Sequence, residues 1–289
     1  MSDREISARE VGSEPDAVSA RVGGAGSVAG LAEISELLRV HDATRPRSTV
    51  ARVFGASPLS LAGRAAFRSA MGEIEVGDAL DLLAAPGSGW HVVHSIAVEE
   101  GAELDHLVIG PTGVYVVTTA AHPDGVVEAS QRTFTVSDVR YPHIRNMEYE
   151  MGRVERLLSA AAGEPVEVSG ILAVVEPKSL VVREAHRDVA VLPASTIVRW
   201  LSTRTRIISP ADVEQIAAAA RLASTWQVAV DAVPDGAALR ERVDRLRGEV
   251  ERAWSLQRLW ATAITVAAAG AFIVVTYSIL VAAIGTGHV

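Results

Sequence analysis

The sequence contains no cysteine, few aromatic residues (4%) and a single lysine, Lys178. Without cysteine the chain forms no disulfide bond and offers no thiolate to a metal, which fits a reducing compartment. The formal net charge of −8 argues against a broad nucleic-acid-binding surface, because phosphate contacts require clustered Lys or Arg. One local run of arginines fits either a small basic patch or a solvated helix face: Arg140, Arg145, Arg153 and Arg156.

Charged side chains are missing altogether from the C-terminal segment Leu259–Val289, which has no Asp, Glu, Lys or Arg. As an α-helix, residues 261–284 would extend about 36 Å, slightly more than the roughly 30 Å hydrocarbon core of a bilayer. Trp254 and Trp260 precede this segment, as interfacial aromatic residues often do. A buried core helix is the alternative, but core helices seldom stay uncharged on every side. The sequence therefore predicts one transmembrane helix over residues 260–284.

The distribution of arginines predicts the orientation of this helix. None follows it, and several precede it: Arg240, Arg242, Arg245, Arg247, Arg252 and Arg258. Cytoplasmic flanks of membrane spans carry an excess of Lys and Arg. We therefore predict a single-pass protein of the cell membrane. Its N-terminal part lies in the cytoplasm, its short C-terminal tail lies outside, and the lipid bilayer is a partner.

Residues 236–258, directly before the span, form an amphipathic segment. Its apolar residues alternate spacings of four and three, as in a coiled-coil seam: Leu239, Val243, Leu246, Val250 and Ala253. Two heptads are fewer than a coiled coil usually needs. A single stalk helix and a homodimer through residues 237–258 therefore both remain open.

The rest of the chain divides into an N-terminal segment and one α/β domain. Residues 1–57 are predicted to be disordered, because residues 1–28 show no periodicity and are rich in Gly, Ser and charge. A short helix (31–40) and a linker (45–49) are expected within them. Residues 58–228 are predicted to form a mixed sheet flanked by helices, and Pro234-Asp-Gly236 a break before the stalk. The expected helices are 60–84, 147–161 and 209–224, and the expected strands are 90–98, 104–109, 114–119, 126–129, 133–136, 168–175 and 188–192.

A predicted β-hairpin contains the first candidate site residue, Asp105. Two apolar strands flank the turn Gly110-Pro-Thr-Gly113, whose Pro and Gly positions are those that type I turns favour. A carboxylate within such a hairpin is costly to bury unless it is hydrogen-bonded, paired or bound to a metal. The alternative is a solvated acid at a strand end.

Glu73 is the second candidate. It lies in line with Val76, Leu80 and Leu83 at helical spacings of three and four, which places its carboxylate on the core-facing stripe of the predicted helix. The alternative is a position at the exposed edge of that stripe.

Four histidines suggest a metal site: His91, His94, His106 and His122. His91 and His94 have opposite parity on one predicted strand, however, and therefore face opposite sides of the sheet. Structural histidines with satisfied hydrogen bonds explain these residues better than a zinc site does.

The chain resembles the nuclease-related domain (NERD) family over roughly residues 65–228. The residues that carry the resemblance are Gly72-Glu73, Trp90-His-Val-Val-His94, Asp105-His-Leu-Val-Ile-Gly-Pro-Thr-Gly-Val114, His122-Pro123, Tyr141-Pro-His-Ile-Arg-Asn146, Glu150 and Leu157–Gly163. The resemblance implies a restriction-endonuclease-like fold. It also implies a nuclease site made of a helix Glu, an Asp and a Glu-x-Lys motif on the second hairpin strand.

Glu73 and Asp105 match the first two positions of that site, but Thr118 and Ala120 replace the Glu and Lys of the motif. In such a site carboxylates hold Mg²⁺, which activates water, and the lysine orients the water or adds positive charge. Here Glu73 and Asp105 leave only a weak Mg²⁺ candidate, and no other cofactor is expected. The sequence therefore predicts a degenerate nuclease that binds or scaffolds a nucleic acid or a protein at the membrane.

The alternative is an active Mg²⁺-dependent nuclease. In that case Glu73 and Asp105 suffice, or another acid, such as Glu128 or Glu150, has moved into the vacant place. Only Lys178 could then replace the missing amine.

Overall fold

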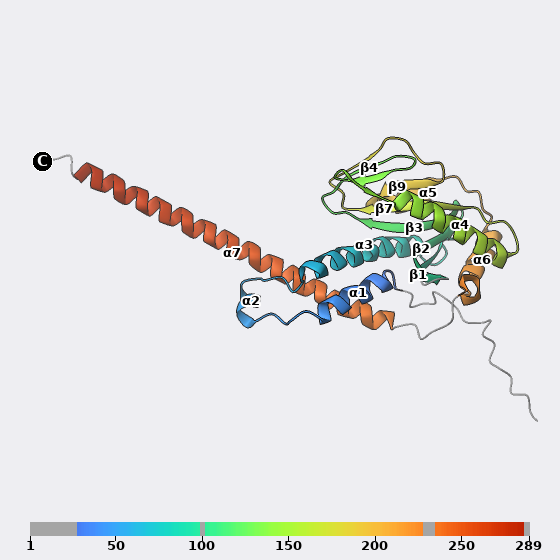
Figure 1. Ribbon diagram of the computed structural model, residues 1–289, viewed down its shortest axis with the longest axis horizontal. Helices are drawn as coiled ribbons and strands as arrows, with labels where there is room; N and C mark the ends of the chain where they lie inside the picture. Colours follow the sequence, from blue (N-terminus) through green and yellow to red (C-terminus); the bar gives the residue numbers. More distant parts are fainter. Residues whose placement is uncertain (1–27, 99–101, 228–234, 286–289) are drawn as a thin grey trace, which may run out of the picture. The chain divides into compact units, whose positions relative to one another are not determined.

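The computed structural model describes residues 28–98, 102–227 and 235–285, with side chains described up to residue 279 (Figure 1). These residues divide into two compact units. We call residues 28–77 and 235–285 the helical unit, and the described part of residues 78–233 the sheet unit. The division falls within helix α3 (Leu61–Leu83), which was predicted as one helix over residues 60–84.

The sheet unit is built on a five-stranded mixed sheet in the order β1-β2-β3-β7-β9. Strands β1 to β3 are antiparallel, and β7 and β9 continue the sheet in parallel with β3. Their bounds are β1 His91–Val98, β2 Ala102–Gly110, β3 Gly113–Ala121, β7 Val168–Val175 and β9 Val189–Pro193. The predicted hairpin is confirmed, with Gly110 paired to Gly113 across the turn.

A second, four-stranded sheet has the order β6-β5-β4-β8. Its strands are β4 Val126–Ala129, β5 Phe134–Val136, β6 Val139–Tyr141 and β8 Ser179–Val182. The β4–β5 hairpin was predicted, whereas β6 and β8 were not. These two strands are short and largely exposed, so they lack the apolar run that identifies a buried strand.

Helix α4 (His143–Ala162) covers the five-stranded sheet along β3 and β7 (Figure 1). Its buried face includes Met147, Met151, Val154 and Leu157, which belong to one cluster with the apolar side chains of the sheet. Fully burying a side chain of this size stabilises the fold by about 1.5–3 kcal/mol. Gly170 on β7 permits the close approach, because a Cβ there would lie 2.5 Å from Met147 Cγ.

The sheet unit ends in two further helices, α5 (Ile197–Thr203) and α6 (Pro210–Ala220). Helix α6 begins as the sequence predicts, because the Ser209 side chain accepts from the Asp212 N–H and Pro210 occupies the first turn. The unit is thus a mixed α/β structure. Its relation to the restriction-endonuclease-like fold stays a prediction.

The helical unit contains α1 (Leu31–Asp42), α2 (Thr49–Val53), the first part of α3 and α7 (Gly236–Gly285). One apolar cluster joins α1, α3 and α7. The short helix expected at residues 31–40 is found as α1, whereas α2 forms at residues 49–53, where no helix was expected. Residues 1–27 lie outside the described part. Helix α2 was missed because it is short and none of its residues is buried.

Helix α7 runs for 50 residues through both the predicted stalk and the predicted span. It is long and apolar enough to cross a membrane by length and composition. Asp235 caps its N-terminus, accepting from the Ala238 N–H at 3.1 Å. Of the predicted break before it, Pro234 lies outside the described residues.

The seam of the stalk is buried within one chain. Val243, Leu246 and Val250 are at most 4% exposed and cluster with Ile34, Leu37 and other side chains of α1 and α3. This burial explains the heptad-like spacing without a second copy. The homodimer through residues 237–258 stays untested, but these seam residues are not exposed for it.

Candidate functional site

Asp105 lies where the regular pairing of its strand is interrupted. The β1–β2 register passes from His94–His106 to Ile96–Leu104 without pairing Ser95 to Asp105, and Ser95 has a positive φ of 48°. The β2–β3 register ends at His106–Val117. Just beyond it, the Thr119 N–H donates to Asp105 Oδ2 at 2.8 Å. The carboxylate thus accepts from a main-chain N–H that the β2–β3 pairing does not use.

Thr118 and Ala120, which the family resemblance aligns with the missing acid and lysine, share the face of β3 that packs on α4. The Thr118 hydroxyl donates to Glu150 Oε2 on α4 at 3.2 Å. Ala120 is only 2% exposed and belongs to the main apolar cluster. The side chain of a lysine at position 120 would start within the apolar core. The space that the family's lysine would need is therefore filled by packed side chains.

Glu150 is the acid that the structure brings to the vacant position. Burial raises the pKa of its carboxyl, and the Thr118 hydroxyl and the charge of Arg153 partly oppose this rise. Glu150 lies 32 residues from Thr118, so the contact depends on how α4 packs over β3. The sequence offered Glu150 only as one of two possible replacements.

We expect the Glu150→Gln substitution to stabilise the sheet unit at pH 7. A pKa that is raised in the folded state means that the folded chain binds more protons than the unfolded chain above the unfolded pKa, so stability falls as pH rises through that window. Glutamine removes this cost and keeps an oxygen that accepts from the Thr118 hydroxyl, a hydrogen bond worth about 1 kcal/mol. Urea unfolding at pH 4 and pH 7 measures it. A gain that is not larger at pH 7 would contradict the assignment, and the exposed Glu155→Gln on the same helix is the control.

Glu73 is 5% exposed, so the alternative of an exposed edge is wrong. Its carboxylate lies against Gly30, where an added Cβ would be 3.0 Å from Glu73 Oε2. Gly30 precedes α1 and provides no side-chain cap, and a carboxylate near a helix N-terminus is stabilising. Glu73 therefore has a structural environment within the helical unit. Asp105 belongs to the sheet unit, and the relative placement of the two units is not determined, so their approach stays a prediction.

The other proposed substitutes have their own surroundings. Glu128 on β4 forms an ion pair with Arg183, the residue after β8, at 2.9 Å. Lys178 is exposed, and its main-chain N–H donates to Gly125 O at 2.9 Å. Of the arginine run, Arg153 is buried over the Tyr149 ring, whereas Arg140, Arg145 and Arg156 are exposed.

Two of the candidate histidines form a buried hydrogen-bonded chain that the sequence did not reveal. His94 Nδ1 lies 2.9 Å from His106 Nδ1, and His94 Nε2 lies 3.0 Å from Asp81 Oδ1. Burial, followed by the neighbouring His94, holds the pKa of His106 well below its usual value. The two rings share one proton between their Nδ1 atoms. Neutral His106 can donate it to His94, whose Nε2–H then donates to Asp81.

The remaining histidines also contact protein groups. His91 lies between Glu214 and Arg221, at 2.9 and 2.8 Å. His122 Nε2 lies 3.2 Å from His143 Nε2, and burial, with a smaller effect of His122, lowers the pKa of His143 to about 4. Within the described ranges, no three His, Asp or Glu side chains gather as a metal-binding group.

Comparison with known families gives one result that bears on these positions. Residues 68–175 match the family model of the nuclease-related domain. The matched region runs from α3 to the end of β7 and includes Glu73, Asp105, Thr118 and Ala120. No curated protein and no solved structure matches the chain. The match supports the family resemblance over a shorter stretch than the predicted residues 65–228.

At the β3 positions of the Glu-x-Lys motif, the described residues differ from the donor set that the family implies for Mg²⁺. Two acids lie beside these positions: Asp105, whose Oδ2 accepts the Thr119 N–H, and Glu150, whose carboxyl pKa is raised by burial. A hard divalent cation requires several ionised oxygen ligands. At the lysine position the chain supplies the buried methyl group of Ala120. What remains is a hydrogen-bonded, closed packing of β3 against α4.

Proposed function

We propose that the chain is a membrane-anchored nuclease-related protein that acts by binding or scaffolding and does not cut phosphodiesters efficiently. The observation that carries this proposal is the occupied position on β3, where Thr118 binds Glu150 and Ala120 is buried. We also propose that the sheet unit has a restriction-endonuclease-like fold, which the matched region supports.

The chemistry of the site supports binding over hydrolysis. Phosphoryl transfer needs electrostatic stabilisation of the charge that develops on the phosphate. The family supplies it with a metal and a lysine, whereas this region supplies a neutral hydroxyl and a methyl group. The net charge of −8 also disfavours an extended nucleic-acid surface. We therefore favour a protein partner over a nucleic acid.

The proposed location is supported by helix α7. None of the described side chains in its apolar part is buried in the isolated chain, as expected of a segment that lipid covers. The arginines of the stalk all precede that part, which supports a cytoplasmic position for both units. The domain would then present its binding surface at the cytoplasmic face of the membrane.

Nuclease assays on the full chain in detergent micelles test this function. With Mg²⁺ or Mn²⁺ and single- or double-stranded substrates, we expect cleavage no faster than that of the Asp105→Ala variant. The exposed Asp188→Ala is the matched control. Robust cutting that Asp105→Ala abolishes and Asp188→Ala spares would establish the enzyme alternative. If the Glu150→Gln variant also loses cleavage, Glu150 is the acid that takes the place of the missing one.

A further inference from the structure

Helix α2 exposes an apolar surface that nothing in the proposed binding function uses. Val50, Val53 and Phe54 are 66%, 52% and 56% exposed, and none of the α2 residues is buried. A five-residue helix with this exposure is not held in place by its own core contacts. Its position must depend on attachments to another element.

That element is α7, at the start of its charge-free part. Trp260 Nε1 donates to Val53 O at 2.9 Å, and the Phe54 and Trp260 rings lie 5.0 Å apart. Gly55, with φ of 75°, lets the backbone approach α7 so closely that a Cβ would lie 2.6 Å from Ala253 O. The exposed apolar residues of α2 are thus fixed within one or two helical turns of Trp260.

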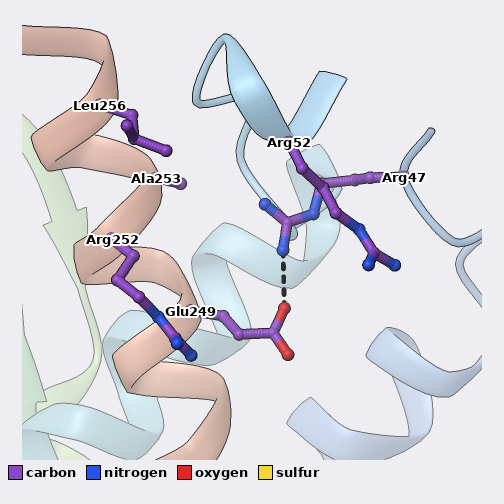
Figure 2. A pocket seen from close by; sticks show the side chains of 6 residues that line it. All are labelled: Arg47, Arg52, Glu249, Arg252, Ala253 and Leu256. Atoms are coloured by element: carbon purple, nitrogen blue, oxygen red, sulfur yellow. Dashed lines mark hydrogen bonds and ion pairs between the residues drawn. The ribbon is translucent and has the colours of Figure 1, made fainter. Parts of the chain in front are cut away.

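Beside these residues is a pocket with net positive charge, lined by Arg47, Arg52, Glu249, Arg252, Ala253 and Leu256 (Figure 2). Arg47 is used structurally, since it pairs with Glu249 at 2.6 Å and donates to Ala56 O at 2.8 Å. Among the described residues, Arg52 and Arg252 form no ion pair. Arg252 Nε donates to Gly248 O at 3.0 Å, so the Arg52 guanidinium and the two terminal nitrogens of Arg252 remain for an anion from outside the chain.

We propose that α2 and this pocket form a binding site for an anionic phospholipid, in which Arg52 and Arg252 hold the headgroup phosphate and Val50, Val53 and Phe54 enter the interface. The proposal rests on the membrane anchor of the proposed function. Exposed apolar residues beside cationic ones are the pattern that binds anionic bilayer surfaces.

The position along α7 favours lipid over a protein partner or a second copy. Ala253 precedes Trp260 by about 10 Å of helix, at 1.5 Å per residue. The headgroup layer on each side of the hydrocarbon core is about 5–8 Å thick. If Trp260 lies at the interface, the pocket therefore lies at or just beyond the level of the phosphates.

The experiment uses the full chain in vesicles and exploits its lack of cysteine. A single Val53→Cys carries a polarity-sensitive fluorophore, and lipids with a quencher near the headgroup report contact. We expect strong quenching in vesicles with about 30% phosphatidylglycerol and weak quenching in pure phosphatidylcholine. From the quenching we obtain the ratio of chains whose α2 contacts the bilayer to chains whose α2 does not. Arg52→Gln and Arg252→Gln should each lower this ratio about fivefold in the anionic vesicles.

Two matched controls accompany it. A label at Glu241→Cys, about 28 Å before Trp260 on the same helix, should not be quenched. Arg245→Gln, whose side chain pairs with Glu241, removes the same charge farther from the span and should leave the ratio unchanged. Inorganic phosphate added to neutral vesicles should not change the emission, because it lacks the bilayer.

The outcomes separate this site from the anchor. If the chain floats with the vesicles but Val53→Cys is quenched no more than Glu241→Cys, the lipid site is overturned and the anchor stands. If free phosphate alone reproduces the response, the pocket is a phosphate site and not a lipid site. Self-quenching between labelled chains that rises with protein density would assign the face to a second copy. A chain that does not float overturns both proposals.

Discussion

Truncation after Arg258 will move the chain from the membrane fraction to the soluble fraction. The removed segment contains the only stretch of the described residues that is long and apolar enough to span a bilayer, and none of its described side chains is buried. At the centre of a membrane helix each Val, Ile, Leu or Phe contributes about −0.3 to −0.6 kcal/mol to insertion, and the segment has enough of them to total several kcal/mol. Without it, only surface contacts remain to hold the chain at a bilayer.

Fractionation with carbonate or detergent measures this change. Because truncation after Arg258 also removes Trp260 and its bond to Val53, a second truncation after Thr265 keeps that contact and should release the chain as well. Full-length chain that stays soluble without detergent would show that α7 is not a membrane span.

The Ala120→Lys substitution will destabilise the sheet unit by about 3–5 kcal/mol, the usual cost of an uncompensated buried charge. Ala120 is 2% exposed among apolar side chains beneath α4. For a unit of this size each kcal/mol lowers the melting temperature by about 2–4 °C, so a fall of roughly 6–20 °C is expected. Calorimetry or thermal unfolding followed by circular dichroism measures it.

Ala120→Leu is the control for size, because overpacking alone costs about 1–3 kcal/mol. The double variant Thr118→Glu/Ala120→Lys restores the motif of the family and should recover part of the loss by pairing the two charges. If its scaffold is intact, it should also show more metal-dependent cleavage than the parent chain. A lysine at Ala120 that leaves stability unchanged would mean that this position opens to solvent, and the closed-site interpretation would fail.

Local sequence patterns predicted the helices and strands well, but they did not predict which side chains contact one another. The helical stripe of Glu73 with Leu80, and the turn at Gly110-Pro-Thr-Gly113, are encoded within a few residues, and both elements formed as expected. The pairing of His94 with His106 depends on strand register, which a single strand does not specify. For this reason the buried histidine chain was not recognised.

Contacts between residues far apart in the chain were the hardest to predict from the sequence. The Thr118–Glu150 bond requires α4 to pack over β3 in one particular register. The seam Leu239–Ala253 shows that one face of a helix is covered, but a stripe carries no information about the partner. The covering residues come from α1, about 200 residues earlier, as the Arg242–Asp42 pair shows. A dimer and an intramolecular bundle leave the same pattern.

The continuity of α7 has a mechanical consequence. Its 50 residues form one helix of about 75 Å, in which the seam against α1 and α3 and the charge-free segment share a single axis. An unbroken helix resists twisting, so a rotation of the membrane segment about its axis would turn Val243 and Val250 out of their apolar cluster. A rotation imposed on the membrane segment would therefore reach the helical unit as a change in side-chain packing.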